Sequence, residues 1–162
     1  AFFGHVDAIK TLVKLDANLV ETRDEHNLTP LHHAVTSGQV NALETLVKLK
    51  ANLEARDQLN RTPLHLAADT GQVDVIEILA KFGADLEARN DFDQTPLHLA
   101  VNKGHMKVIE KLAEIGADLE ARDGLGRTPL RLAKDGGHRL AVKILSNLIE
   151  ARHFHNFFRP RS

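Results

Sequence analysis

The tetrapeptide Thr62-Pro63-Leu64-His65 is the stretch that indicates the fold, because it recurs at a constant spacing along the chain. The other copies are Thr29-Pro30-Leu31-His32, Thr95-Pro96-Leu97-His98 and, with arginine in the last place, Thr128-Pro129-Leu130-Arg131. Each copy begins 33 residues after the one before it. A fixed period of this length predicts a solenoid, in which each unit buries its apolar face by stacking on the next unit.

Within one unit the residues predict two short helices joined by a tight turn. Threonine followed by proline is a favoured helix start, so a first helix is expected from Pro63 to the turn glycine Gly71. A second apolar run at helical spacing extends from Val73 to Phe82 and ends at Gly83. The connection to the next unit then passes through a turn whose central residue must tolerate a left-handed backbone. The residues in that column are Asn27, Asn60, Asp93 and Gly126.

These features together resemble the ankyrin repeat, and the resemblance covers nearly the whole chain. It implies an all-α repeat solenoid, in which antiparallel helix pairs carry projecting β-hairpin loops and stack into a curved array. It also implies a module that binds other proteins without catalysis. One column departs from the family, which commonly has asparagine where this chain has Glu54, Glu87 and Glu120. Asparagine hydroxylation, known for the family at that column, is therefore not expected here.

The predicted array covers residues 1–152 as about four full units preceded by an N-terminal half unit. The boundaries follow the repeat: a half unit at 1–23, units at 24–56, 57–89 and 90–122, and a capping unit at 123–152. Gly4 aligns with the turn glycine Gly38, so the earlier turns of the first helix of the half unit are missing. We therefore expect the chain to be a fragment of a longer array.

The last unit is predicted to be a cap, because a terminal repeat needs a polar outer face. Arg131 replaces the repeated histidine, and Lys134 stands in a column that is otherwise apolar. The tail at 153–162 holds three of the seven phenylalanines. We expect this tail to fold back over the last helix pair or to lack order; the alternative is a basic and aromatic peptide that docks elsewhere.

Composition argues against several other classes of protein. The net charge is −1, without the basic excess that nucleic-acid binding requires. Cysteine is absent, which fits a reducing compartment, and no apolar run has the roughly 20 residues needed to cross a bilayer. The sequence therefore predicts a soluble cytoplasmic protein, monomeric, without membrane insertion.

No catalytic, metal or cofactor site is predicted. Three of the ten histidines, His32, His65 and His98, repeat with the tetrapeptide, and in the family this histidine is structural, bonding backbone near the helix start. Zinc-binding spacings and phosphate-binding loops are absent from the sequence. The glutamates and arginines of the connecting segments, such as Glu87 and Arg89, alternate and are interpreted as a solvated ladder of charges.

The candidate partner-binding residues lie at the loop tips and on the adjoining first helices. Large apolar residues occur in one tip column, although a turn requires only polar residues there. Arginine recurs two residues later and is interpreted as a flanking hydrogen-bond donor. The alternative is that the tip residues pack on one another as a stabilising ladder. The tip columns contain His26, Leu59, Phe92 and Leu125, and then Leu28, Arg61, Gln94 and Arg127, while Asp69 and Lys103 extend the surface along the first helices.

The sequence thus predicts a non-catalytic recognition module that grips a protein partner, with Phe92 as the central anchor. Two other functions remain open. The array could be the targeting arm of a larger enzyme or channel, or it could be an engineered or purely structural scaffold.

Overall fold

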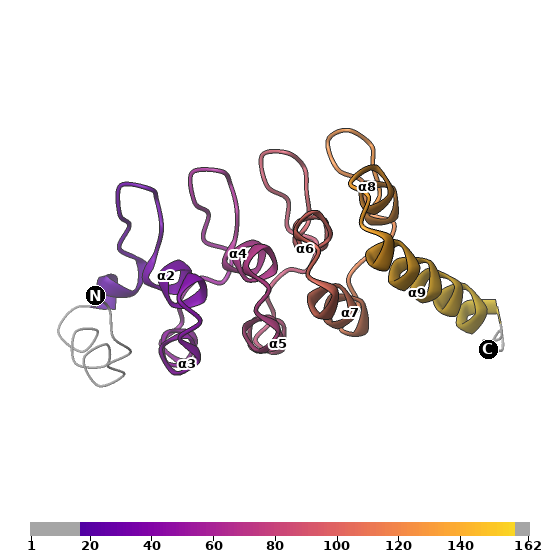
Figure 1. Cartoon of the computed structure of the whole chain (residues 1–162). Helices are drawn as coiled ribbons and strands as arrows, with labels where there is room; N and C mark the ends of the chain where they lie inside the picture. The colour runs from indigo at the N-terminus through magenta and orange to yellow at the C-terminus, as the bar shows by residue number, and fades with distance from the viewer. Residues whose placement is uncertain (1–16, 158–162) are drawn as a thin grey trace.

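The computed structural model describes residues 17–157, and these form one elongated row of helix pairs (Figure 1). The row begins with a short 3-10 helix, η1 (Ala17–Glu21). Four pairs follow: α2 (Pro30–Thr36) with α3 (Val40–Lys48), α4 (Pro63–Thr70) with α5 (Val73–Lys81), α6 (Pro96–Lys103) with α7 (Met106–Glu114), and α8 (Pro129–Asp135) with α9 (Arg139–Phe157). The expected second helix of the half unit, near residues 4–13, lies outside the described residues.

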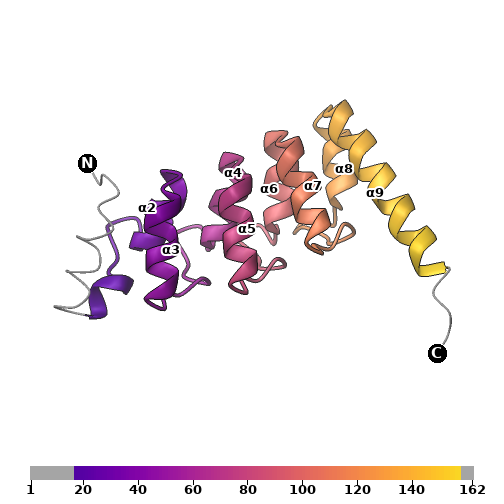
Figure 2. The same ribbon diagram turned by 90° about the horizontal axis from the view of Figure 1, so that it is seen from below.

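The first helices of the pairs form one layer and the second helices form another, as the two views show (Figure 1; Figure 2). Loops project from one edge of the row, above α2, α4, α6 and α8. The expected all-α repeat solenoid is confirmed. The expected β-hairpins are present only as loops, since no residue between 17 and 157 is in a strand.

One apolar core runs along the row without interruption. Leu31, Leu64 and Leu97, which follow the proline of each tetrapeptide, are at most 1% exposed. Ile76 and Ile109 of the second helices are fully buried. Each unit therefore covers its neighbour, as expected of a solenoid whose stability comes from the contacts between adjacent units.

The helix starts and the turn residues follow the sequence prediction. Thr62 has the extended backbone of a helix cap, its hydroxyl oxygen accepts from the His65 amide at 3.4 Å, and Pro63 occupies the first turn. The turn glycine Gly71 has a φ of 79°, and Asn60, at a loop tip, has a φ of 58°. The left-handed conformations predicted at these columns are confirmed.

Helix α9 differs from the second helices of the other units. It is 19 residues long and continues through 153–157, so this part of the tail neither folds back nor lacks order, contrary to expectation. The remaining tail residues, 158–162, lie outside the described residues. The guanidinium of Arg152 donates to the carbonyls of Ala113 at 2.5 Å and Ala117 at 2.8 Å. This cation thus caps the carboxyl end of α7 and ties α9 to it.

Candidate protein-binding surface

Each projecting loop is closed by the side chain of its first residue. In the second unit, Asp57 Oδ1 accepts hydrogen bonds from the amides of Leu59 at 2.9 Å and Arg61 at 2.8 Å. The Asp57 amide in turn donates to the Arg61 carbonyl at 3.0 Å. The same pair of side-chain bonds recurs at Asp24, Asn90 and Asp123. Such a turn fixes the loop backbone and turns the residue at its tip outward.

The second carboxylate oxygen of the turn residue also has a partner. Asp57 Oδ2 accepts from Arg61 Nε and Nη2, each at 2.8 Å, and Asp123 Oδ2 accepts from Arg127 Nε at 3.0 Å and Nη2 at 2.8 Å. Burial acts to raise the pKa of Asp123, but the hydrogen bonds from Arg127 and Leu125 outweigh it and lower that pKa below its usual value. Arg61 and Arg127 therefore hold the turns. Their contact with a partner stays a prediction.

Neighbouring tips are joined through their backbones. The Asp91 amide donates to the Leu59 carbonyl at 3.2 Å, and the Gly124 amide donates to the Phe92 carbonyl at 3.0 Å. A Cβ at Gly124 would lie only 3.0 Å from that Phe92 oxygen, so glycine suits this close approach. At the first junction the Gln58 side chain replaces the backbone bond and donates to the Glu25 carbonyl at 2.6 Å. The tips are therefore linked as a ladder, through backbone bonds at two junctions and a side-chain bond at the first.

The apolar side chains at the tips nevertheless remain exposed. Leu59 is 44% exposed, Phe92 62% and Leu125 76%. His26, the first member of this column, is also exposed. Leu28 differs, because it is partly buried against the core, and Gln94 is half-buried and accepts from Asn90 Nδ2 at 3.4 Å.

The predicted extension of the surface lies at the ends of two first helices. Lys103 Nζ, on α6, is 3.6 Å from Asp69 Oδ1, on α4, and the lysine side chain is half-exposed. The pair joins adjacent units on the helices that follow the loop tips. The structure thus brings these two predicted residues together.

The charged residues of the connecting segments have a role that the sequence interpretation missed. Glu87 Oε1 accepts from the Asp118 amide at 2.7 Å, while Arg89 Nη1 donates to the Asp93 carbonyl at 2.8 Å and to the Arg122 carbonyl at 2.5 Å. Equivalent bonds link the preceding units through Glu54 and Arg56. The expected solvated charge ladder is therefore wrong, because these side chains bind the backbone of adjacent units. Recurrence of the same charge every 33 residues was the available signal.

The repeated histidines also join adjacent units. His65 Nδ1 accepts from the Thr62 amide at 3.2 Å, so the proton is on Nε2, which donates to the Gln94 carbonyl of the next unit at 3.0 Å. His32 and His98 repeat this arrangement. Burial lowers the pKa of His65 to about 4. The structural role predicted for these histidines is confirmed, and it includes a bond across the unit boundary.

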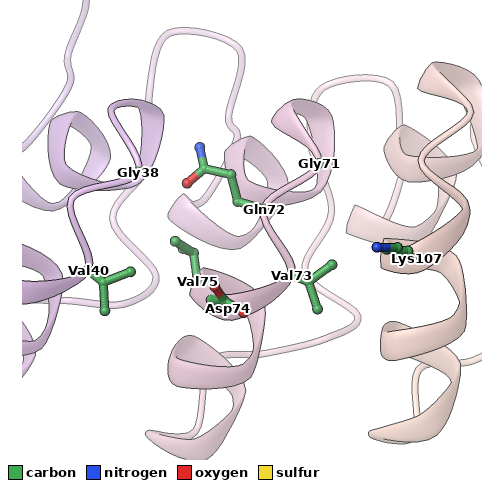
Figure 3. Close-up of a pocket in the computed structure, with 8 residues that line it drawn as sticks. All are labelled: Gly38, Val40, Gly71, Gln72, Val73, Asp74, Val75 and Lys107. Atoms are coloured by element: carbon green, nitrogen blue, oxygen red, sulfur yellow. The ribbon is translucent and has the colours of Figure 1, made fainter.

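A depression of about 340 Å³ opens at the helix turns, away from the loop tips (Figure 3). Val40, Val73 and Val75 supply much of its lining, and Gln72 crosses it to donate to the Val35 carbonyl at 2.7 Å. Among the described residues, none of the His, Asp and Glu side chains gather in groups of three suited to a metal ion. The described helices also include none that is both long and apolar enough to span a membrane.

Stacked helix pairs, joined at their loops by repeated hydrogen bonds, define a helical repeat solenoid. A sequence model of ankyrin repeats in three copies matches residues 1–90 and 82–155. The chain therefore belongs to the ankyrin repeat family, whose members are generally protein–protein interaction modules and typically lack enzymatic activity. None of the curated proteins compared with the chain is significantly similar to it. Its cytoplasmic location and monomeric state stay predictions.

Proposed function

We propose that the array binds a protein partner through its tip row, defined as Leu59, Phe92 and Leu125. The observation that carries this proposal is the exposure of three large apolar side chains in equivalent positions on adjacent loops. Apolar residues in a continuous row on a surface favour an interface, since water would otherwise cover them. Asp69 and Lys103, paired at the ends of two first helices, extend the proposed surface.

The loop backbone supports this function because it is already ordered. The turn bonds of Asp57 and its equivalents, together with the bonds between tips, fix the backbone that carries the three side chains. A partner then binds without the entropic cost of ordering these loops. Arg61 and Arg127 contribute by holding the turns.

Phe92 is the central anchor of the proposed interface. It occupies the middle loop of the three, and its ring is more than half exposed. Complete burial of such a ring by a partner contributes about 2 kcal/mol from the apolar area alone. Aromatic residues near the centre of an interface are common binding hot spots.

Affinity capture tests this function with three matched baits. These are the wild-type chain, the triple variant Leu59→Ser, Phe92→Ser and Leu125→Ser, and the control Phe82→Ser. Phe82, on the opposite layer of helices at the end of α5, is 44% exposed, the same fraction as Leu59. We expect a partner that the wild type and the control retain and the triple variant loses.

The captured partner is then purified and its affinity for each bait is measured by titration calorimetry. The triple variant is expected to weaken binding at least about 100-fold, because the lost hot-spot contacts exceed about 2.7 kcal/mol. As a control for folding, circular dichroism is used to compare the helicity and the melting temperature of the three baits, which are expected to be equal. Equal affinity of the triple variant and the wild type would refute the tip row as the binding surface.

A further inference from the structure

Four basic side chains lie on the outer surface of the last helix pair. They are Arg131 and Lys134 on α8 and Arg139 and Lys143 on α9, and all four are exposed. This pair ends the described row, and Figure 1 shows no further pair beyond it. We define these four residues as the C-terminal end face.

The register of the repeat shows that the two residues on α8 face away from the array. His98 stands one repeat before Arg131, and its Nε2 bonds to the carbonyl of Arg127 in the next unit at 3.1 Å. Val101 stands one repeat before Lys134 and is fully buried. Arg131 and Lys134 therefore occupy positions that a following unit would cover.

The two residues on α9 occupy such positions as well. Glu77 stands two repeats before Lys143, and it pairs at 2.7 Å with Lys111 Nζ of the next unit. Val40 stands three repeats before Arg139, and it lines a depression together with Val75 of the next unit (Figure 3). All four cations thus belong to one face, the face at which the described row of helix pairs ends.

The charges of this face are mostly positive, with Asp135 as an acidic exception, and most of the cations lack an acidic neighbour among the described residues. Arg131 pairs with Asp135, its Nε lying 2.9 Å from Oδ1, but Lys134, Arg139 and Lys143 form no ion pair with the described residues. The asymmetry extends to the whole chain. Residues 123–162 contain eight Lys or Arg and three Asp or Glu, whereas residues 1–122 contain 13 Lys or Arg and 19 Asp or Glu. A cap needs only polarity, which balanced charges also supply, so this positive excess needs a second explanation.

Apolar surface accompanies the cations. Leu130 and Val142 are only partly buried, although their equivalents one repeat earlier, Leu97 and Ile109, are at most 1% exposed. The end face therefore combines positive charge with aliphatic patches that no described unit covers. A partner that fits it must supply both acidic and apolar side chains.

We propose that the C-terminal end face docks an acidic segment of a protein chain that also carries apolar side chains. Carboxylates pair with Lys134, Arg139 and Lys143, and apolar side chains cover Leu130 and Val142. A protein segment fits better than a nucleic acid, because the latter offers few aliphatic groups and the acidic remainder of the array repels an extended polyanion. This surface is separate from the tip row, and the proposal does not depend on binding at the tip row.

The probe is a fluorescent 12-residue peptide in which glutamate and leucine both occur, with anisotropy measured at about 50 and 200 mM salt. The end-face variant is Lys134→Glu, Arg139→Glu and Lys143→Glu. The control variant is Lys48→Glu, Lys81→Glu and Lys107→Glu, which makes the same change in charge on α3, α5 and α7. The tip-row triple variant is measured alongside.

We expect the end-face variant to bind at least about tenfold more weakly than the wild type, and the control variant to lose less than about threefold. The tip-row variant should bind the peptide as the wild type does, so the two surfaces are tested separately. Higher salt should weaken binding of the wild type. Backbone amide shifts on adding peptide should concentrate in α8 and the start of α9.

Three results would overturn the proposal. The first is no binding by the wild type, and the second is an equal loss in the end-face and control variants, which would reveal attraction to net charge alone. The third is tighter binding of an oligothymidine or of an all-glutamate peptide than of the mixed peptide. Because all the substituted residues are exposed, the melting temperatures should agree, and the amide shifts of the wild type test the site without any substitution.

Discussion

Lys50 holds a backbone conformation that suits glycine better. Its φ is 68°, and the equivalent residues of the next two units are Gly83 and Gly116. A left-handed backbone costs a residue with a Cβ about 1 kcal/mol relative to glycine. Nothing lies within 4 Å of a Cβ built at either glycine, so the strain at Lys50 is local.

Lys50→Gly is therefore expected to raise the free energy of unfolding by about 0.5–1 kcal/mol, measured by urea denaturation. The matched control is Lys48→Gly, which places glycine in the last turn of α3. This substitution should lower the free energy of unfolding by about 1 kcal/mol. Destabilisation of equal size by both substitutions would show that Lys50 is not strained.

The buried histidines should make stability depend on pH. Burial holds the pKa of His65 at about 4 in the folded state, and it also lowers the pKa of His32 and His98. The unfolded chain binds protons at about pH 6.5 while the folded chain does not, so stability is complete above pH 6.5 and falls as the pH drops toward 4.

Each histidine contributes a slope of up to about 1.4 kcal/mol per pH unit in this window. Urea unfolding at pH 7 and pH 5 should show the loss, and His65→Gln should reduce the difference between the two pH values. His26→Gln, at an exposed tip, is the control. An unchanged pH difference in the His65 variant would contradict the assignment.

At the scale of the element, the loop depends on one carboxylate. Asp57→Ala removes the acceptor for two amides and leaves the Arg61 guanidinium without its partner, so it should lower the free energy of unfolding by about 2–3 kcal/mol. The control is Asp91→Ala in the next loop, where Asp91 follows the turn residue Asn90 and is exposed. This substitution should change the free energy of unfolding by less than about 0.5 kcal/mol. Thermal unfolding followed by circular dichroism gives both values, and equal effects would mean that the turn bonds add nothing.

Features encoded by neighbouring residues could be predicted from the sequence. The helix starts, the turn glycines and the left-handed tip residues each follow from a few adjacent amino acids, and the period of 33 residues places them in every unit. The left-handed Lys50 escaped prediction because the residue type there does not match its conformation.

Contacts between units were harder to predict, because they depend on the register of one unit against the next. Glu87 and Arg89 looked like solvated charges, yet each binds backbone 31 or 33 residues away. The continuation of α9 was missed for a similar reason, since Arg152 stabilises it through one carbonyl of α7 and one just beyond that helix. Of the predicted surface, exposure favours Leu59, Phe92 and Leu125, while Leu28 packs against the core.

At the scale of the whole molecule, the chain offers two surfaces on one continuous core. The tip row lies along one edge of the stack, and the C-terminal end face lies on the last described helix pair. Because each unit contacts only its neighbours, a substitution in one loop should leave distant units folded. The two surfaces can therefore be altered independently, as the proposed variants require.

The most direct test of binding at the tip row is amide hydrogen exchange of the array, free and in complex with its captured partner. Binding at the tip row predicts slower exchange in the complex over residues 57–61, 90–94 and 123–127, with little change in α3, α5 and α7. Slower exchange confined to those second helices, with the loop tips unchanged, would contradict it.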